Sequence, residues 1–295
     1  MVQLINSKQN IFNDNIAYVE QWDFSRANLN EESRINAITQ VASICYQNPK
    51  ALNSESLYNR LMAESIGLPS SSYEFVPILL SVGSVQSITD TARKLYFKDD
   101  KVPLPHLNIR KFGEYVCKTK YLLTNLRALI ADVGPDESLK YFNTKEECEI
   151  IKQHFKVFQY KIDLPTRSQM VRHRVSWQEL SRRYVSGSRV PFEFYVSEKM
   201  ENVESFYHWT DDETSVYSTD EVINICLNHY KQALSQGVKP QEARRIIPQA
   251  AYTQIWGAFM PKQLDNYFKL RLDEHSQLEI RQTAIAMQEL IQGNR

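Results

Sequence analysis

Apolar residues recur at helical spacing in the first part of this chain. Residues 30–64 carry such a pattern, and Asn30 stands where it can cap the first helix. Asn48-Pro49 interrupts the pattern, which resumes over residues 54–66. The sequence therefore predicts two consecutive helices, and the apolar positions of the first are Ile35, Ile38, Val41, Ala42 and Cys45.

Two segments of the chain have the patterns of strands. Tyr73–Leu80 follows a predicted turn at Pro69–Ser72, and Pro77 within it favours an edge strand or a bulge. Phe155–Ile162 alternates between apolar and polar residues, as a half-buried strand does. The segment between them, about 85–150, predicts mainly helices and a tight turn at Gly134-Pro135-Asp136.

The C-terminal half predicts a turn at Pro165, then a loop-rich connection over 186–215 with a short strand near Phe192–Val196. Helices are expected at 219–236, 240–257 and 261–292. In the last of these, Arg271 shares a seven-residue repeat with three aliphatic residues that we expect to be buried. The aliphatic members of the repeat are Leu264, Leu278 and Ile285. An arginine on such an apolar face either pairs with a buried acid or faces a ligand pocket.

The composition narrows the class of protein. The chain has 295 residues, 42% of them hydrophobic and 24% charged, as in ordinary globular proteins. A formal net charge of zero argues against a dedicated nucleic-acid binder. We read no signal peptide and no membrane-spanning run, so a cytoplasmic location is expected. The four cysteines form no C-x-x-C pair, and the histidines suggest no metal site.

Glycine-based nucleotide motifs are absent from the sequence. Only 8 of the 295 residues are glycine, and no two of them form the G-x-G of a dinucleotide fingerprint. The glycine-rich phosphate loop is missing as well. If this protein binds a nucleotide, its side chains must therefore supply the phosphate donors.

Residues 169–184 carry a concentrated basic cluster. Four arginines and His173 fall within residues 172–183, and Glu179 is the only carboxylate among them. Arginine is favoured where planar, bidentate donors meet phosphate or carboxylate oxygens. A buried salt-bridge network or a mildly basic helix is the structural alternative. Because the basic excess is confined to one short segment, it fits a small anionic ligand better than a long polyanion.

The same segment resembles a known family signature. Arg172-His173-Arg174, preceded by Gln169 and followed by Ser181 and Arg183-Tyr184, resembles the signature of the flavin-dependent thymidylate synthases, the ThyX family. Two C-terminal segments resemble that family in the same order, and these are Arg244–Pro248 and Gln263–Arg271. The resemblance implies an α+β fold in which a small β-sheet is flanked by long helices.

This chain departs from the family pattern at several positions. Six residues separate Arg174 from Ser181, one fewer than in the family. We expect the deletion to fall at Val175–Trp177, so that Arg183 rather than Arg182 meets the phosphate. Residues 67–75 lack the two histidines that the family usually carries. We interpret the chain as a single domain, 1–295, with a helical insertion at about 85–150.

The resemblance implies an enzyme that converts dUMP to dTMP by reductive methylation. Methylenetetrahydrofolate would be the carbon donor, FAD the redox cofactor and NADPH the reductant. These small molecules would be its partners, with no nucleic acid or membrane partner. Family members are homotetramers with FAD and dUMP at subunit interfaces, so a homotetramer is expected here.

Residue roles follow from the same resemblance. Arg271 would contact the uracil edge and stabilise negative charge as C5 becomes nucleophilic, because its own pKa is too high for a general base. Glu179 would orient arginines or accept a bond from a ribose hydroxyl. Cofactor binding would involve Arg172, His173, Arg174, Glu179, Asn266 and Ser71. Substrate binding would involve Gln169, Arg172, Glu179, Ser181, Arg182, Arg183, Arg271 and one of Arg244 and Arg245.

Two other classes of function remain open from the sequence. An RNA-binding module could use the basic cluster, with Trp177 and Tyr184 stacking on bases. A catalytically inactive relative could keep the fold and act as a nucleotide- or RNA-binding protein. The shortened spacing before Ser181 and the missing histidines leave room for this second alternative.

Overall fold

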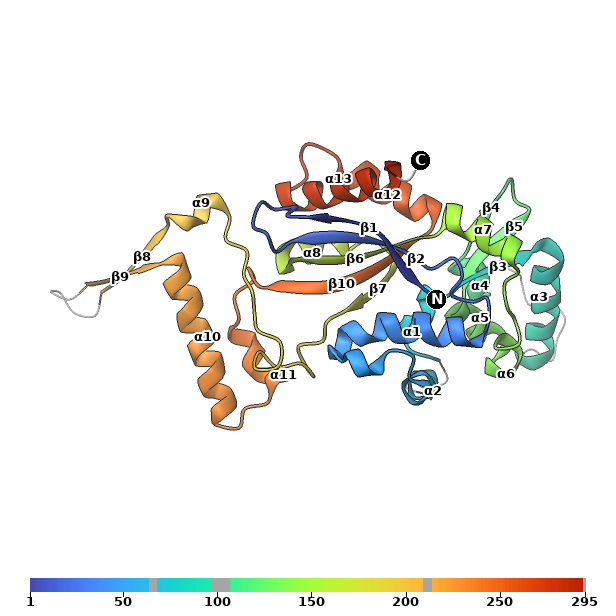
Figure 1. Cartoon of the computed structure of the whole chain (residues 1–295), viewed down its shortest axis with the longest axis horizontal. Coiled ribbons are helices and arrows are strands. Elements are labelled where there is room, and N and C mark those ends of the chain that lie inside the picture. Colours follow the sequence, from blue (N-terminus) through green and yellow to red (C-terminus); the bar gives the residue numbers. More distant parts are fainter. Residues whose placement is uncertain (64–67, 97–106, 209–213, 294–295) are drawn as a thin grey trace.

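A five-stranded antiparallel sheet forms the centre of the protein (Figure 1). The computed structural model describes residues 1–63, 68–96, 107–208 and 214–293. The strands follow the order β1-β2-β6-β10-β7, so β6 and β10 lie inside the sheet and β7 forms one edge. Their bounds are β1 Gln3–Gln9, β2 Tyr18–Asp23, β6 Lys156–Asp163, β7 Ser176–Glu179 and β10 Tyr252–Phe259.

Helices cover both faces of this sheet. Helices α8 (Leu164–Met170), α12 (Pro261–Arg271) and α13 (Leu278–Gln292) lie along one face, and α1 (Glu31–Tyr46) lies along the other (Figure 1). The first face buries Tyr160 and Phe259 against Tyr267 of α12. The second buries Trp256 and Val157 in a cluster that includes α1. The predicted α+β fold, with a sheet flanked by long helices, is confirmed.

The first two predicted helices are present. Asn30 caps α1 by accepting a bond from the Ser33 N–H. After the break, a 3₁₀ turn η1 (Pro49–Ala51) leads into α2 (Glu55–Ala63). The predicted end of the second helix, Ile66, lies outside the described residues.

A second, three-stranded sheet has the order β3-β5-β4. The strand predicted at Tyr73–Leu80 starts later, because a 3₁₀ helix, η2 (Ser71–Phe75), takes its first half. Pro77 is the first residue of β3, an edge strand, as its missing N–H requires. The bounds are β3 Pro77–Ser81, β4 Glu114–Val116 and β5 Tyr121–Asn125.

The described parts of the 85–150 segment, 85–96 and 107–150, are mainly helical, as predicted, but they also contribute two strands of this second sheet. The sequence did not predict β4 and β5, which form a short hairpin joined by residues 117–120, with β5 also paired to the distant strand β3. Gly134 forms the expected turn at a φ of 78°. Residues 97–106 lie outside the described residues. The helices here are α3 Val82–Tyr96, α4 Asn108–Lys111, α5 Leu126–Val133, α6 Pro135–Ser138 and α7 Lys145–His154.

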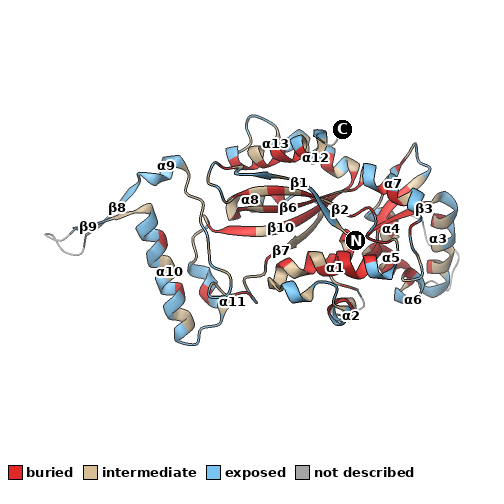
Figure 2. Cartoon of the chain, viewed as in Figure 1, coloured by how far each residue is buried: buried red, intermediate tan, exposed pale blue. Residues whose placement is uncertain are grey.

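Residues 198–208 and 214–246 form an arm that projects from the main body (Figure 1). The predicted helix at 219–236 is confirmed as α10. Its surface is largely exposed (Figure 2), and Ile223 and Tyr230 are its buried residues. The strands β8 and β9 were not predicted. The arm contains α9 Glu198–Glu201, β8 Glu204–His208, β9 Thr214–Ser218, α10 Thr219–Ser235, α11 Pro240–Ala243 and η4 Arg244–Ile246.

Three local predictions were wrong. The helix predicted at 240–257 ends at Ile246, and Tyr252–Phe259 is the strand β10. A strand buried on both faces does not alternate, so its apolar run cannot be told from a buried helix by periodicity. Pro165 lies in the first turn of α8 rather than in a separate turn. The strand near Phe192–Val196 is reduced to one isolated bridge between Phe194 and Ala251.

The last predicted helix is two helices, α12 and α13. The break follows Arg271, where the Ser276 hydroxyl donates to the Leu270 carbonyl and Asp273 accepts from the His275 N–H. Because the break shifts the phase of the repeat, Leu278 and Ile285 are 50% and 41% exposed instead of buried. None of the helices in the described ranges is both long and apolar enough to span a lipid bilayer.

Candidate functional site

Arg271 and His173 meet at the end of α8, although 98 residues separate them in the sequence. Arg271 Nε donates to His173 Nε2 at 2.8 Å, and its Nη2 donates to the Gln169 carbonyl at 3.0 Å. The His173 ring packs against Tyr267, with 4.8 Å between ring centroids. No acid pairs with Arg271 among the described residues. The Arg271–His173 pair thus connects the Arg172-His173-Arg174 segment with the C-terminal segment Gln263–Arg271.

His173 is neutral in this arrangement. It is a buried residue, and burial, followed by the Arg271 charge, lowers its pKa from 6.5 to about 4. Because Nε2 accepts the bond from Arg271, the ring proton must reside on Nδ1. Burial also lowers the pKa of Arg271, and the charge of Arg172 acts in the same direction.

This neutral histidine predicts a pH dependence of stability. The unfolded state takes up a proton near pH 6.5 and the folded state only near pH 4, so stability falls as the pH is lowered between these values. We expect the free energy of unfolding of wild type, relative to His173→Gln, to rise as the pH rises from 4 to 6.5. Urea unfolding at several pH values measures this difference. A difference that does not change with pH would show that His173 titrates normally.

Glu179 is held by two side chains that the sequence analysis did not select. Arg167 of α8 donates to Glu179 Oε2 through Nε, at 2.8 Å, and through Nη2. The Thr253 hydroxyl donates to Oε1 at 3.0 Å. The arginine that Glu179 orients is thus Arg167, which stands two residues before the recognised motif. Helix α8 carries both this ion pair and the Gln169 carbonyl that fixes Arg271.

The other residues of β7 are tied to α1 and η2. The Ser71 hydroxyl donates to Gln178 Oε1 at 2.5 Å, and Gln178 Nε2 donates to the Cys45 sulfur at 2.8 Å. Cys45 in turn bonds to the Glu179 carbonyl, and its own carbonyl accepts from the Ser181 N–H. These bonds hold the end of β7 against the end of α1.

Arg182 and Arg183 have different surroundings. Arg182 turns back into its own loop, where it donates to the Val190 and Pro191 carbonyls and lies 4.1 Å from the centre of the Phe192 ring. Arg183 is exposed, with its guanidinium 5.5 Å from the centre of the Tyr184 ring. Of the two, Arg183 is therefore the more available to a ligand.

A cavity of about 630 Å³ opens beside Arg174. Arg174, Lys111 and Lys262 line it together with apolar and aromatic residues. Glu74 and Glu114 also line it; Glu74 pairs with Arg127 at 2.7 Å, and Glu114 accepts a bond from the Lys262 N–H at the start of α12. The cavity joins the basic motif to the 85–150 segment; its other lining residues include Phe112, Tyr115, Phe155, Val175 and Met260.

Comparison with known families identifies the family of this chain. The sequence profile of the family described as "Thymidylate synthase complementing protein" matches residues 136–294, more than half of the chain. The chain belongs to this family. The matched range contains the central motif, β10 and the helix of Arg271.

Two curated relatives are similar to this member of the thymidylate synthase complementing family. Both are named flavin-dependent thymidylate synthase. The one from Kosmotoga olearia is 30% identical over 145 residues, which are 46% of this chain and 63% of the relative. The one from Pyrococcus furiosus is 32% identical over 125 residues, 41% of this chain and 47% of the relative. The chain thus spans about half to two thirds of the length of these relatives.

Among solved structures, the UMP/dUMP methylase PolB from Streptomyces cacaoi bound with 5-Br UMP is similar to this chain. The two share 22% sequence identity, with a TM-score of 0.37. The similarity covers 47% of this chain and 69% of that chain.

Four of the residues selected for this family's chemistry lie apart from the Arg271–His173 pair or point outward. Asn266 is exposed on α12, and Arg172 is exposed beside His173. Arg244 and Arg245 are both exposed on η4 of the arm, where Arg245 pairs with Glu242 at 3.0 Å. In the described part of the chain, the bonds of Arg244 and Arg245 go to Gln241 and Glu242, within the arm.

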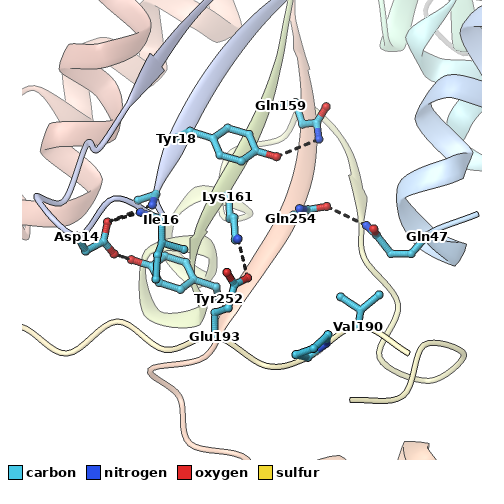
Figure 3. A network of polar contacts seen from close by, with 12 residues as sticks. Asp14, Ile16, Tyr18, Gln47, Gln159, Lys161, Val190, Glu193, Tyr252 and Gln254 are labelled. Carbon is cyan, nitrogen blue, oxygen red and sulfur yellow. Dashed lines mark hydrogen bonds and ion pairs between the residues drawn. The ribbon is translucent and has the colours of Figure 1, made fainter. Parts of the chain in front are cut away.

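A polar network covers the other face of the sheet (Figure 3). Lys161 of β6 pairs with Glu193 at 2.5 Å, and Tyr252 of β10 bonds to Asp14. Gln47 Nε2 donates to Gln254 Oε1 at 2.8 Å. These bonds hold residues 190–197 and the C-terminal end of α1 against strands β6 and β10. No local sequence pattern predicts this network, because its partners are distant in the chain.

Proposed function

We propose that this protein converts dUMP to dTMP by flavin-dependent reductive methylation. Methylenetetrahydrofolate would donate the carbon, and NADPH would be the reductant. The observation that carries the proposal is the bond between Arg271 and the buried, neutral His173. It brings the two separated motifs of the family resemblance into one site at the end of α8, the helix whose Arg167 pairs with Glu179 of β7.

The bonds of Arg271 support the proposal that it activates the pyrimidine. Its bonds to His173 and Gln169 use Nε and Nη2, which leaves Nη1 without a partner among the described residues. Because its histidine partner is neutral, the full positive charge of the guanidinium stays available. A fixed cation at the uracil edge stabilises the negative charge that builds on the ring as C5 attacks. The role of Arg271 is therefore electrostatic.

Arg183 is proposed to bind the dUMP phosphate together with Ser181 and Gln169. We expect Arg183→Ala to weaken dUMP binding by about tenfold or more, because charge-assisted bonds contribute roughly 1.5–3 kcal/mol each. Arg182→Ala should instead destabilise the loop around Phe192 and change dUMP affinity less. Calorimetric titration with dUMP measures both. A larger loss of affinity in Arg182→Ala, with folding intact, would mean that the register of the motif is wrong.

The residues around Arg174 fit a flavin nucleotide. The chain has no glycine-rich phosphate loop, so the diphosphate must be met by side chains, and Arg174, Lys262 and Lys111 line one cavity. The aromatic and apolar walls of this cavity suit the ring systems of FAD. Bound FAD would supply hydride transfer. The chain's own residues would bind it and exclude water, with Ser71, Glu179 and Asn266 as further proposed contacts.

A homotetramer is proposed as the working assembly. The arm exposes apolar residues that a lone chain leaves in water, with Phe206 62% and Ile225 51% exposed. It also carries Arg244 and Arg245 away from the other candidate residues. In an assembly, either arginine could reach the dUMP site of a neighbouring subunit.

The flavin spectrum of the purified protein tests this proposal. We expect the protein to copurify with FAD, and its absorbance to be bleached by NADPH without oxygen. Arg174→Gln should lose FAD, whereas Lys145→Gln, an exposed change on α7, should retain it. A colourless protein that cannot be reconstituted with FAD would instead indicate a relative that binds nucleotides without this chemistry.

A further inference from the structure

A second basic cavity, of about 370 Å³, lies at the C-terminal end of α1. Its walls come from the α1–α2 connection, from the first turns of α2 and from Arg189 in the loop that follows the basic motif. None of the residues proposed for FAD, and none proposed for dUMP, lines it. It also lies outside the cavity beside Arg174, with which it shares no lining residue.

The charged side chains among the described lining residues of this cavity are all cationic. Lys50, Arg60 and Arg189 line it, and no aspartate or glutamate does so among the described residues. Ser54 and Ser56 line it as well, at the start of α2, where Ser54 accepts a bond from the Leu57 N–H. The positive end of the helix dipole therefore adds to the three cationic side chains. Such a site complements an oligoanion.

The loop that carries Arg189 is fixed in place. Arg189 Nη2 donates to the Gln47 carbonyl at 3.2 Å, and the Tyr184 ring packs 5.9 Å from the Tyr46 ring. Arg183, proposed for the dUMP phosphate, lies against the other ring of this pair, Tyr184. The basic surface thus continues from Arg183 across the tyrosines to the cavity. A ligand here would lie next to bound dUMP.

We propose that this cavity binds the oligoanionic end of a co-substrate. The shared chemistry is a cluster of negative charges, which the phosphates of a dinucleotide reductant or the carboxylates of a glutamate-extended folate both provide. The single phosphate of dUMP is already assigned to Arg183 and Ser181, and three cations exceed its needs. The proposal that a co-substrate occupies the cavity rests on the proposed function. The affinity of the cavity for oligoanions does not depend on that function.

The test uses the full chain and two matched double variants. Lys50→Gln with Arg189→Gln removes two charges from the cavity. Lys118→Gln with Lys120→Gln removes two exposed charges from the β4–β5 turn and is the control. Calorimetry would measure the affinity of each protein for five ligands: tripolyphosphate, 2′-phospho-ADP-ribose, a folate with three glutamates, a folate with one glutamate, and dUMP.

We expect the cavity variant to lose about tenfold or more affinity for tripolyphosphate, and for one of the two co-substrate probes. Loss for phospho-ADP-ribose assigns the cavity to the reductant, and selective loss for triglutamate folate assigns it to the folate. Unchanged affinity for all oligoanions, or an equal loss of dUMP affinity, would overturn the proposal. A protein that makes no dTMP but binds oligoanions through Lys50 and Arg189 would leave the site standing without the proposed reaction.

Discussion

Arg271→Ala is expected to reduce dTMP formation by about 10²- to 10³-fold in kcat, the usual effect of removing one preorganised electrostatic group. The substitution removes the guanidinium that His173 and the Gln169 carbonyl hold at the end of α8. FAD binding should change little, because Arg271 does not line the cavity beside Arg174. Steady-state kinetics, with the flavin content measured in parallel, check both statements.

Two further variants sharpen this prediction. Arg271→Lys keeps the charge but cannot donate to His173 and Gln169 in the geometry of a planar fork, so most of the loss should persist. Arg281→Ala removes an arginine of α13 that donates to the Glu274 carbonyl, and this variant should retain normal turnover. Near-normal turnover in Arg271→Ala would mean that another group activates the pyrimidine.

Gly257→Ala is expected to destabilise the protein and displace β7. Gly257 of β10 pairs with Trp177 of β7, and a Cβ at position 257 would meet the Trp177 ring at 2.5 Å. Overpacking of this kind costs about 1–3 kcal/mol. Trp177 also donates to the His173 carbonyl, so movement of its ring should disturb the Arg271–His173 pair. Urea unfolding and dUMP titration would measure the two effects.

The control for this change is Gly83→Ala in α3. A Cβ there meets nothing closer than the Ser81 hydroxyl at 3.9 Å, so alanine should be neutral or stabilising by up to about 1 kcal/mol. Gly257→Ala combined with Trp177→Leu should recover part of the lost stability, because the clash is removed. Full stability in Gly257→Ala alone would show that β7 has room that the structure does not provide.

Local sequence patterns predicted the elements whose formation depends mainly on residues close by in the chain. Asn30 and the break at Asn48-Pro49 define α1 and α2, and the alternation of Phe155–Ile162 defines β6. The strand β10 was missed because both of its faces are buried, which removes the period of two. The helix break after Arg271 depends on side-chain bonds of Asp273 and Ser276 that no periodicity reveals.

The candidate site was predictable only in part for a related reason. Motif residues were recognisable by type and spacing, but their partners lie far away in the chain. Arg167 and Thr253, which hold Glu179, stand outside the motif, and Thr253 is 74 residues from its partner. The neutrality of His173 depends on burial against Tyr267, which only the folded chain provides.

The measurement that tests the central proposal most directly is dTMP formation from dUMP by the purified protein. We predict product only when methylenetetrahydrofolate and NADPH are supplied and the protein carries bound FAD, with Arg271→Ala strongly impaired under the same conditions. Product formed at the same rate by protein stripped of its flavin, or without NADPH, would contradict the proposal. So would the absence of dTMP from a folded, FAD-loaded protein that binds dUMP.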